Sequence, residues 1–190
     1  MLLNKETIRE QARFHRDRLA VDQMDFERVI NAFMSGFKPQ KEDVIALYWP
    51  SGKEFNTRFL IDELVKQEFQ CALPCVEKGS RILSFKTWKP DDPLEKGAYG
   101  IYEPVEGEAV EPNVFICPLL AFDRYGYRMG QGGGYYDATI AHYRAQKDIT
   151  AIGVGYGQQA VLFNLPIEEH DQKMDYVLTP EGMIDHRKLD

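Results

Sequence analysis

The residues best suited to chemistry lie in a glycine-rich segment from 128 to 137, which reads Arg-Met-Gly-Gln-Gly-Gly-Gly-Tyr-Tyr-Asp. Gly130 precedes the run Gly132–Gly134, and each glycine costs about 0.5–1 kcal/mol relative to alanine inside a helix or strand. The segment is therefore typical of a turn. If a helix begins near Tyr135, backbone N–H groups and the helix N-terminus converge on one point, which favours a phosphate. Arg128 adds a planar guanidinium that suits phosphate oxygens.

The glycines alone leave a second interpretation open, namely a flexible surface turn without a ligand. Their spacing does not match the Walker pattern GxxxxGK[ST], because no lysine follows. It does not match GxGxxG after a strand either, since residues 130–134 give only GxGxG. By themselves the glycines indicate an anion-binding turn but no particular nucleotide site.

Other charged residues fall where a ligand could reach them. Lys5 and Arg9 are four residues apart and so share one face of a predicted helix, although such a pair is also typical of a solvated face. Asp137 would lie in the first turn of a helix, where the dipole favours an acid. Asp171 could cap a turn before the last strand. Glu54 would follow the carboxyl end of a buried strand, where ligands of parallel sheets bind.

Charge and hydropathy exclude several classes of protein. A net charge of −7 argues against a broad nucleic-acid surface but not against a small anionic ligand. The longest apolar runs, such as residues 114–122, are far shorter than the ~20 residues that cross a bilayer. The N-terminal residues do not form a secretory signal. We therefore expect a cytoplasmic protein with no nucleic-acid or membrane partner.

Three cysteines, Cys71, Cys75 and Cys117, lie in apolar, strand-like segments, which is typical of buried reduced thiols. Cys71 and Cys75 could share a metal, but no second pair or nearby histidine completes a zinc site. We expect these side chains to pack rather than to react.

Alternating helices and strands must position these residues. We expect helices at 4–20, at 22–33 with Gly36 as the stop, at 57–69 and at 135–144. We expect strands at 44–49, 71–76, 82–88, 114–119, 150–156 and 176–179. This order predicts an α/β fold, with one domain spanning residues 1–190. Its architecture would be a three-layer, Rossmann-like α/β/α arrangement with a largely parallel central sheet.

The glycine-rich segment is also part of a longer pattern. In chain order the pattern comprises Lys5-Glu-Thr-Ile-Arg9, Glu54-Phe-Asn-Thr57, Gly100-Ile-Tyr-Glu-Pro104, Pro118–Asp123 with Gly126–Asp137, and Gln158 with Leu165–Asp171. These segments resemble the signature of 5-formyltetrahydrofolate cyclo-ligases, also called methenyltetrahydrofolate synthetases. The resemblance spans nearly the whole chain.

The resemblance implies an ATP-dependent ligase that forms a C–N bond. The formyl oxygen on N5 of 5-formyltetrahydrofolate would attack the γ-phosphate of ATP, and N10 would then close the ring with loss of phosphate. The products would be 5,10-methenyltetrahydrofolate, ADP and phosphate. Such a reaction needs positioning and charge neutralisation rather than a protein nucleophile. The implied partners are 5-formyltetrahydrofolate and ATP, with Mg²⁺ as the cofactor.

The resemblance also implies roles for individual residues. Arg128 would be the catalytic cation. The implied ATP-binding residues are Lys5, Arg9, Arg128, Met129, Gly130, Gln131, Gly132, Gly133, Gly134, Tyr135 and Tyr136. The implied folate-binding residues are Arg9, Trp49, Glu54 and Tyr135. Asp137 and Asp171 would be the magnesium ligands. A tryptophan that closes a buried strand is equally typical of core packing, so that alternative stays open for Trp49.

Other functions also stay open. Many cyclo-ligases carry Lys, Arg or Tyr where this chain has Gln131 or Gly133, and many carry Arg in place of Ala138. A non-catalytic folate- or nucleotide-binding paralogue is therefore the main rival. A third hypothesis is a related kinase or ligase acting on another formylated or carboxylated substrate. His170 receives no catalytic role, because a lone loop histidine is usually structural. We expect a monomer or a weak dimer.

Overall fold

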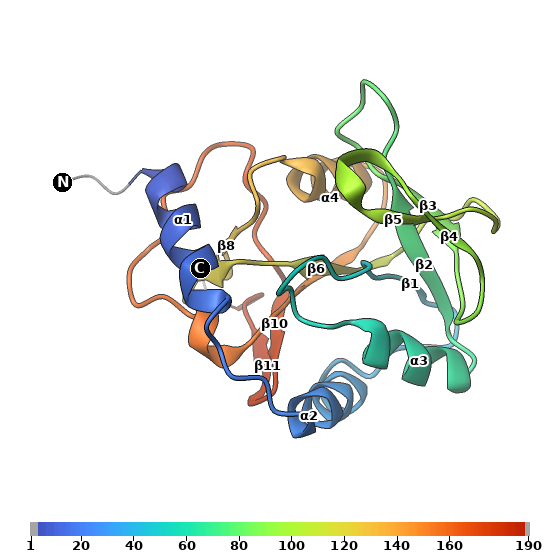
Figure 1. The fold of residues 1–190 in the computed structure, drawn as a ribbon, viewed down its shortest axis with the longest axis horizontal. Helices are drawn as coiled ribbons and strands as arrows, with labels where there is room; N and C mark the ends of the chain where they lie inside the picture. Colours follow the sequence, from blue (N-terminus) through green and yellow to red (C-terminus); the bar gives the residue numbers. More distant parts are fainter. Residues whose placement is uncertain (1–3, 189–190) are drawn as a thin grey trace.

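The computed structural model describes residues 4–188, and a seven-stranded sheet forms its centre (Figure 1). From edge to edge the strands are β11 (Gly182–Asp185), β10 (Tyr176–Thr179), β9 (Thr150–Val154), β6 (Val114–Pro118), β1 (Val44–Ala46), β2 (Gln70–Cys75) and β3 (Ser84–Thr87). The five inner strands are parallel, whereas β11 and β3 pair antiparallel at the two edges. The largely parallel sheet predicted from the sequence is confirmed.

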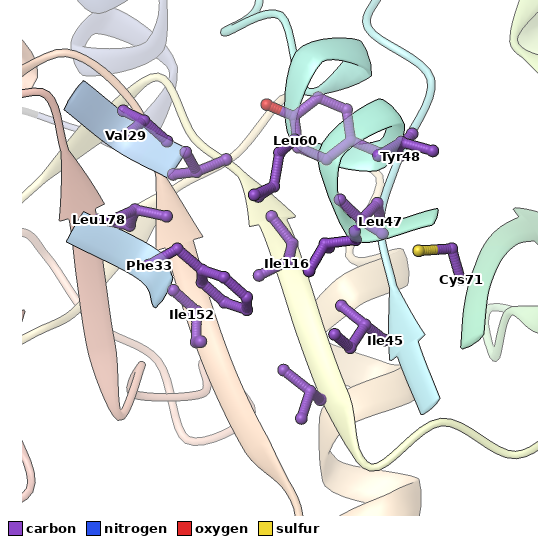
Figure 2. Packing of buried hydrophobic residues seen from close by; sticks show 14 of the residues in the cluster. Val29, Phe33, Ile45, Leu47, Tyr48, Leu60, Cys71, Ile116, Ile152 and Leu178 are labelled. Atoms are coloured by element: carbon purple, nitrogen blue, oxygen red, sulfur yellow. The ribbon is translucent and has the colours of Figure 1, made fainter. Parts of the chain in front are cut away.

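Helices cover both faces of this sheet, as the three-layer prediction requires. α2 (Met24–Ala32) and α3 (Arg58–Lys66) pack on one face, and α4 (Tyr135–Arg144) packs on the other. Strand residues alternate between the two layers. Ile116 of β6 packs toward α2 and α3 (Figure 2), while its neighbour Cys117 belongs to the cluster on the α4 side. Burial on both faces explains why the strands are continuous apolar runs in the sequence.

α1 (Lys5–Arg16) lies beside the sheet rather than over it (Figure 1). Its N-cap is Asn4, whose side chain accepts the Thr7 N–H at 2.8 Å. On its apolar side, Ile8 clusters with Met129 and Leu165. These contacts dock α1 against the hairpin of β7 (Ala121–Phe122) and β8 (Arg128–Met129) and against the loop before β10. The basic side of α1 is thereby directed at these loops.

The predicted stop of the second helix at Gly36 is wrong. The chain continues past α2 as a π-helical turn, Phe33–Phe37, and ends at Lys38 in the left-handed conformation with φ 58°. Gly36 has a packing role instead, because a Cβ there would lie 3.2 Å from Met183 Cβ. Helix α3 is likewise followed by a left-handed residue that is not glycine, Glu68 with φ 60°.

Other element boundaries differ from the prediction by a few residues. α1 ends at Arg16 rather than near residue 20, since the chain turns at Asp17. The short strands β4 (Leu94–Lys96), β5 (Tyr102–Pro104), β7, β8 and β11 were not predicted. Strands of two to four residues are too short to show a hydrophobic period. Two 3₁₀ turns, Ala98–Gly100 and Gly157–Gln159, complete the elements.

The remaining fold predictions have mixed outcomes. Cys71 and Cys117 are buried free thiols, and desolvation raises the pKa of each to about 12, whereas Cys75 is only half-buried. Within the described residues, no helix combines the length and apolar character needed to cross a bilayer. The single domain over 1–190 stays a prediction, and residues 1–3 and 189–190 lie outside the described part of the chain.

A buried histidine supports the hairpin that carries Arg128. His186 is 1% exposed and packs under the β7–β8 turn, where a Cβ on Gly126 would lie 2.8 Å from its ring Cγ. Burial lowers the pKa of His186, and the nearby Arg124 backbone offsets this only in part. The folded protein thus disfavours the protonated ring.

We expect His186 to make the protein less stable in acid. Because its folded pKa lies below the unfolded value, the unfolded chain binds the proton more readily, and the free energy of unfolding falls as pH drops below about 6.5. His186→Phe should lose this part of the pH dependence. Urea denaturation of both proteins at about pH 7.5 and about pH 5.5 measures the difference. If the free energy of unfolding falls by the same amount in wild type and in His186→Phe between these two pH values, the expectation is wrong.

Candidate active site

A cleft of about 840 Å³ opens at the carboxyl edge of the parallel strands. It lies where the strand order reverses, because the chain passes from β1 to β2 on one side and from β6 to β9 on the other. Trp49 follows β1, Leu119 follows β6, and both line the cleft. Ligands of open α/β sheets bind at such switch points. Topology alone therefore favours a ligand site here.

Every residue predicted for the site lines this one cleft. The set comprises Lys5, Arg9, Trp49, Glu54, the whole run 128–137 and Asp171. These residues come from α1, the loop after β1, the segment between β8 and α4, and the loop before β10. The structure thus brings together what is scattered in the sequence. The role of each residue in binding or catalysis stays a prediction.

The glycine-rich segment forms a turn that leads directly into α4, as the sequence predicts. Gly132 (φ 104°) and Gly134 (φ 70°) adopt backbone conformations that residues with a Cβ rarely take. Gly134 is the N-cap of α4, so the N-terminus of this helix and the positive end of its dipole lie at the cleft wall. A Cβ on Gly132 would lie 3.4 Å from Arg9 Nε, which places α1 directly over the turn.

Arg128 and Asp137 form a largely buried ion pair beside this turn. Arg128 Nη2 lies 3.3 Å from Asp137 Oδ2, and the Arg128 side chain is 4% exposed. The guanidinium also faces the Tyr136 ring at 5.8 Å. Its Nε is buried and has no hydrogen-bond partner among residues 4–188. Since an unpaired buried donor is costly, this group suits an anionic atom of a ligand.

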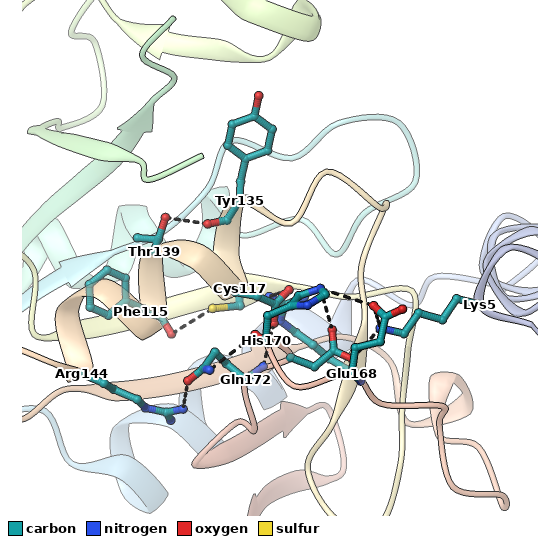
Figure 3. A network of polar contacts seen from close by, with 12 residues as sticks. Lys5, Phe115, Cys117, Tyr135, Thr139, Arg144, Glu168, His170 and Gln172 are labelled. Atoms are coloured by element: carbon teal, nitrogen blue, oxygen red, sulfur yellow. Dashed lines mark hydrogen bonds and ion pairs between the residues drawn. The ribbon is translucent and has the colours of Figure 1, made fainter. Parts of the chain in front are cut away.

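Lys5 ties the start of α1 to the loop before β10. Its Nζ lies 2.7 Å from Glu168 Oε2 (Figure 3). The same atom lies 2.6 Å from Asp171 Oδ2. Burial alone would lower the pKa of Lys5, but the hydrogen bonds to the two carboxylates outweigh it and raise the pKa. Burial alone would raise the pKa of Asp171, but the hydrogen bonds from Lys5 and from the Glu168 backbone outweigh burial and lower the pKa. Both groups therefore stay charged at neutral pH.

Two arginines of α1 reach the glycine turn. Arg9 Nη1 pairs with Glu6 Oε2 at 3.1 Å, while its Nε is buried and unpaired within the described chain. Arg13 Nη2 donates to Gln131 Oε1 at 3.2 Å. The turn thus receives positive charge from α1 although the turn itself has no basic side chain between Gly130 and Gly134. Arg13 was not predicted as a site residue.

Glu54 and Trp49 come from the loop that follows β1. Glu54 Oε2 accepts the Ser51 N–H at 2.9 Å. Desolvation raises the pKa of Glu54, and Ser51, Arg16 and Gln131 offset this in part. Trp49 packs edge-on against Trp88 with ring centroids 5.3 Å apart, so it belongs to the core as well as to the cleft wall.

The carboxylates predicted to bind magnesium lie near one another and offer suitable oxygen atoms. Asp137 Oδ1 accepts the backbone N–H of Gln172 at 3.0 Å, next to Asp171. Donor atoms of Glu168, His170 and Asp171 lie within 4.8 Å of each other. Hard oxygen donors fit Mg²⁺, which usually takes one or two carboxylates plus phosphate oxygens. Lys5 already pairs with Asp171 and Arg128 with Asp137, so a bound Mg²⁺ would share the two carboxylates with these cationic side chains.

Sequence reasoning missed Arg16, which lines the cleft and is only 6% exposed. A signal for it does exist in the sequence. Lys5, Arg9, Arg13 and Arg16 recur at intervals of four, four and three residues, which places them on one helix face. The whole row lines the cleft.

The fold and the cleft together define an α/β protein with a basic, glycine-lined cleft at the switch point of a mostly parallel sheet. The model of the 5-formyltetrahydrofolate cyclo-ligase family matches residues 3–180. The chain therefore belongs to the 5-formyltetrahydrofolate cyclo-ligase family, which confirms the resemblance seen in the sequence.

Comparisons with individual proteins point to the same family. The chain is 35% identical over 133 residues to the 5-formyltetrahydrofolate cyclo-ligase of Haemophilus influenzae, covering 67% of this chain and 70% of that protein. It is 34% identical over 146 residues to that of Escherichia coli K12, covering 72% and 77%. The NMR structure of Aquifex aeolicus 5,10-methenyltetrahydrofolate synthetase matches with a TM-score of 0.81 and 29% identity, covering 99% of this chain and 95% of that one.

Proposed function

We propose that the protein is an ATP-dependent ligase that cyclises 5-formyltetrahydrofolate to 5,10-methenyltetrahydrofolate and releases ADP and phosphate. The observation that carries this proposal is the basic cleft over the glycine turn. In it, buried N–H groups of Arg9 and Arg128 have no partner in the described chain and lie beside the N-terminus of α4. Such an arrangement suits a polyphosphate. Membership of the cyclo-ligase family supports the folate as the second substrate.

The residues around the turn would bind and orient the triphosphate. Arg128 would donate to the γ-phosphate and stabilise the charge that spreads over its oxygens during transfer. Arg9 and the turn backbone would fix the remaining phosphates, with Lys5 adding positive charge. Asp137 and Asp171 would hold Mg²⁺, which when bound supplies further positive charge to the phosphate oxygens.

The substrates themselves provide the reacting groups. The formyl oxygen on N5 forms a bond to the γ-phosphorus while the bond from that phosphorus to ADP breaks. N10 then adds to the formyl carbon and loses its proton, and phosphate leaves with the former formyl oxygen. Glu54 would accept N–H groups of the pterin, and Trp49 and Tyr135 would offer flat ring surfaces. The chain's contribution is positioning and charge stabilisation.

The methenyl product provides the test. Purified protein mixed with 5-formyltetrahydrofolate, ATP and Mg²⁺ should develop the near-ultraviolet absorbance of 5,10-methenyltetrahydrofolate. The signal should be absent when either ATP or Mg²⁺ is left out. Folded protein that gives no signal in the complete mixture would rule out the proposed activity.

A non-catalytic folate- or nucleotide-binding protein is the second candidate. The observation that favours it is the lack of a cationic side chain at Gln131 and Gly133. Calorimetry separates the two functions. Heat of ligand binding without ADP release over hours supports the binding protein, whereas continuous ADP release with both substrates supports the ligase.

Removing the carboxylate of Asp137 should raise the magnesium requirement. In Asp137→Asn, we expect the Mg²⁺ concentration for half-maximal activity to rise about tenfold, because one charged oxygen ligand is lost. Asp148→Asn is the matched control, since Asp148 is exposed just beyond the other end of α4. A Mg²⁺ titration of the methenyl assay measures both variants. An unchanged requirement in Asp137→Asn would argue against a ligand role.

A further inference from the structure

Arg16 is a cleft residue to which the proposed reaction gives no role. It is the last residue of α1, and its side chain is 5% exposed. Nε and Nη2 lie 3.2 Å and 3.0 Å from Asp17 Oδ1, so one part of the guanidinium is already bound. Nη1 is also buried, but it donates to no atom of residues 4–188. A charged donor that is buried in a cleft without an acceptor indicates a ligand group at that point.

Glu54 provides the complementary group in the same cleft. The Ser51 N–H, the Arg16 guanidinium and the Gln131 side chain favour the ionised form of its carboxylate, and the charge of Glu54 in turn acts on the buried Tyr48 and Tyr136. Arg16 is the one cation among them. Gln131 in turn accepts from Arg13, so α1 is linked to the Glu54 carboxylate through Gln131 as well as through the charge of Arg16.

A carboxylate and a free guanidinium N–H that face the same cleft can recognise a cyclic amide. The pterin ring carries an N–H and an amino group on one edge, directly beside a carbonyl oxygen. A carboxylate can accept from the two donors, and a guanidinium can donate to the carbonyl. A site with these two groups also rejects a ring in which the carbonyl is replaced by a donor, because two donors would then face each other.

We propose that Arg16 is a specificity-determining residue that donates its Nη1–H to the 4-carbonyl oxygen of the pterin while Glu54 accepts the adjacent ring N–H. This inference rests on the proposed function, in which 5-formyltetrahydrofolate occupies the cleft. The positive charge of Arg16 has a second effect on the same contact, because it favours the ionised form of the otherwise desolvated Glu54. Arg16 would thus select the ring and favour the charged form of its partner.

The direct experiment measures the affinity of wild type and Arg16→Met for 5-formyltetrahydrofolate and for its 4-amino-4-deoxy analogue by calorimetry. Wild type should bind the analogue about 10- to 100-fold more weakly. Arg16→Met should bind 5-formyltetrahydrofolate about 10- to 100-fold more weakly than wild type, because a charge-assisted hydrogen bond is lost. The variant should separate the two ligands by less than about threefold, and its affinity for ATP should stay within about threefold.

Two further variants separate recognition from structure. Arg18→Met removes the same charge from an exposed arginine two residues away, which stacks on Phe14 outside the cleft, and should leave both folate affinities unchanged. Arg16→Lys keeps the charge without the guanidinium fork. Folate binding by Arg16→Lys should weaken in acid over the same pH range as in wild type, whereas in Arg16→Met it should weaken at a higher pH. The reason is that loss of the positive charge raises the pKa of Glu54.

Several outcomes would overturn the proposal. Unchanged folate affinity and unchanged discrimination in Arg16→Met would exclude the contact with the carbonyl. Equal weakening of folate and ATP, or equal effects of Arg16→Met and Arg18→Met, would assign Arg16 to the stability of α1 instead. If Arg16→Met does not fold, full discrimination in Arg16→Lys decides against the guanidinium contact. If wild type neither binds nor converts 5-formyltetrahydrofolate, the proposed function fails first and this inference fails with it.

Discussion

Replacing Arg128 by alanine is expected to lower kcat/KM for 5-formyltetrahydrofolate cyclisation by about 10- to 100-fold. The side chain is 4% exposed, and its Nε has no partner within the described part of the chain. A ligand phosphate would therefore gain a charge-assisted contact worth roughly 1.5–3 kcal/mol, which the alanine variant cannot make. Initial rates of methenyl formation at varied ATP and folate concentrations give the value.

The matched control for this change is Arg124→Ala. Arg124 lies on the same β7–β8 hairpin, but it is exposed and stacks on Tyr125 at 4.7 Å. Its loss should change kcat/KM less than about twofold, as is usual for an exposed charge. Arg128→Ala also deprives Asp137 of its partner, so thermal unfolding of both variants must accompany the kinetics. Wild-type kinetics in Arg128→Ala would refute the catalytic role that we propose for this residue.

Substitution of Gly132 by alanine should weaken ATP binding by at least about tenfold. At φ 104° an alanine is strained by roughly 1–3 kcal/mol, and its Cβ would lie 3.4 Å from Arg9 Nε. The turn would therefore move, and with it the backbone N–H groups that we propose to bind phosphates. Calorimetric titration with MgATP measures the loss of affinity.

Gly79→Ala separates this effect from general backbone strain. Gly79 has φ 84°, its Cβ would meet no atom within 4 Å, and it does not line the cleft. Both variants should lose unfolding free energy, but only Gly132→Ala should lose ATP affinity. Equal ATP affinity in the two variants would show that the path of the turn through Gly132 does not matter for binding.

The sequence predicts those parts of the fold in which a single physical pattern covers many residues. Val114–Pro118 is a strand because all its side chains are apolar and both faces of the sheet are covered. Helix α4 begins at Tyr135 as expected, because the glycines before it cannot continue a regular element. The ordered pattern from Lys5 to Asp171 predicts which residues share the cleft, although they are up to 166 residues apart.

What the sequence does not predict depends on tertiary contacts. The second helix, extended by its π-helical turn, ends at Lys38 in the left-handed conformation. Lysine rarely adopts this conformation, and no local signal in the sequence favours it there. The edge strands β4, β5 and β11 form by pairing with one neighbour rather than by burial. Arg16 looks like part of a solvated helix face until the docking of α1 encloses its side chain.

The contribution of α1 also changes the argument about the glycine turn. Judged from the turn alone, Gln131 and Gly133 leave the proposed phosphate site short of positive charge. In the structure Arg9 lies against Gly132 and Arg13 binds Gln131, so a separate element brings the cations. The sequence pattern that suggests a non-catalytic binding protein is therefore compatible with the proposed ligase.

The most direct measurement counts ADP and 5,10-methenyltetrahydrofolate formed in the same reaction by wild-type protein. If formyl-oxygen phosphorylation drives ring closure, the two products appear together in equal amounts, and neither forms when 5-formyltetrahydrofolate or ATP is omitted. In Arg128→Ala both rates should fall together by about 10- to 100-fold. ADP release without methenyl product, or no product at all from folded protein, would contradict ATP-dependent cyclisation by this cleft.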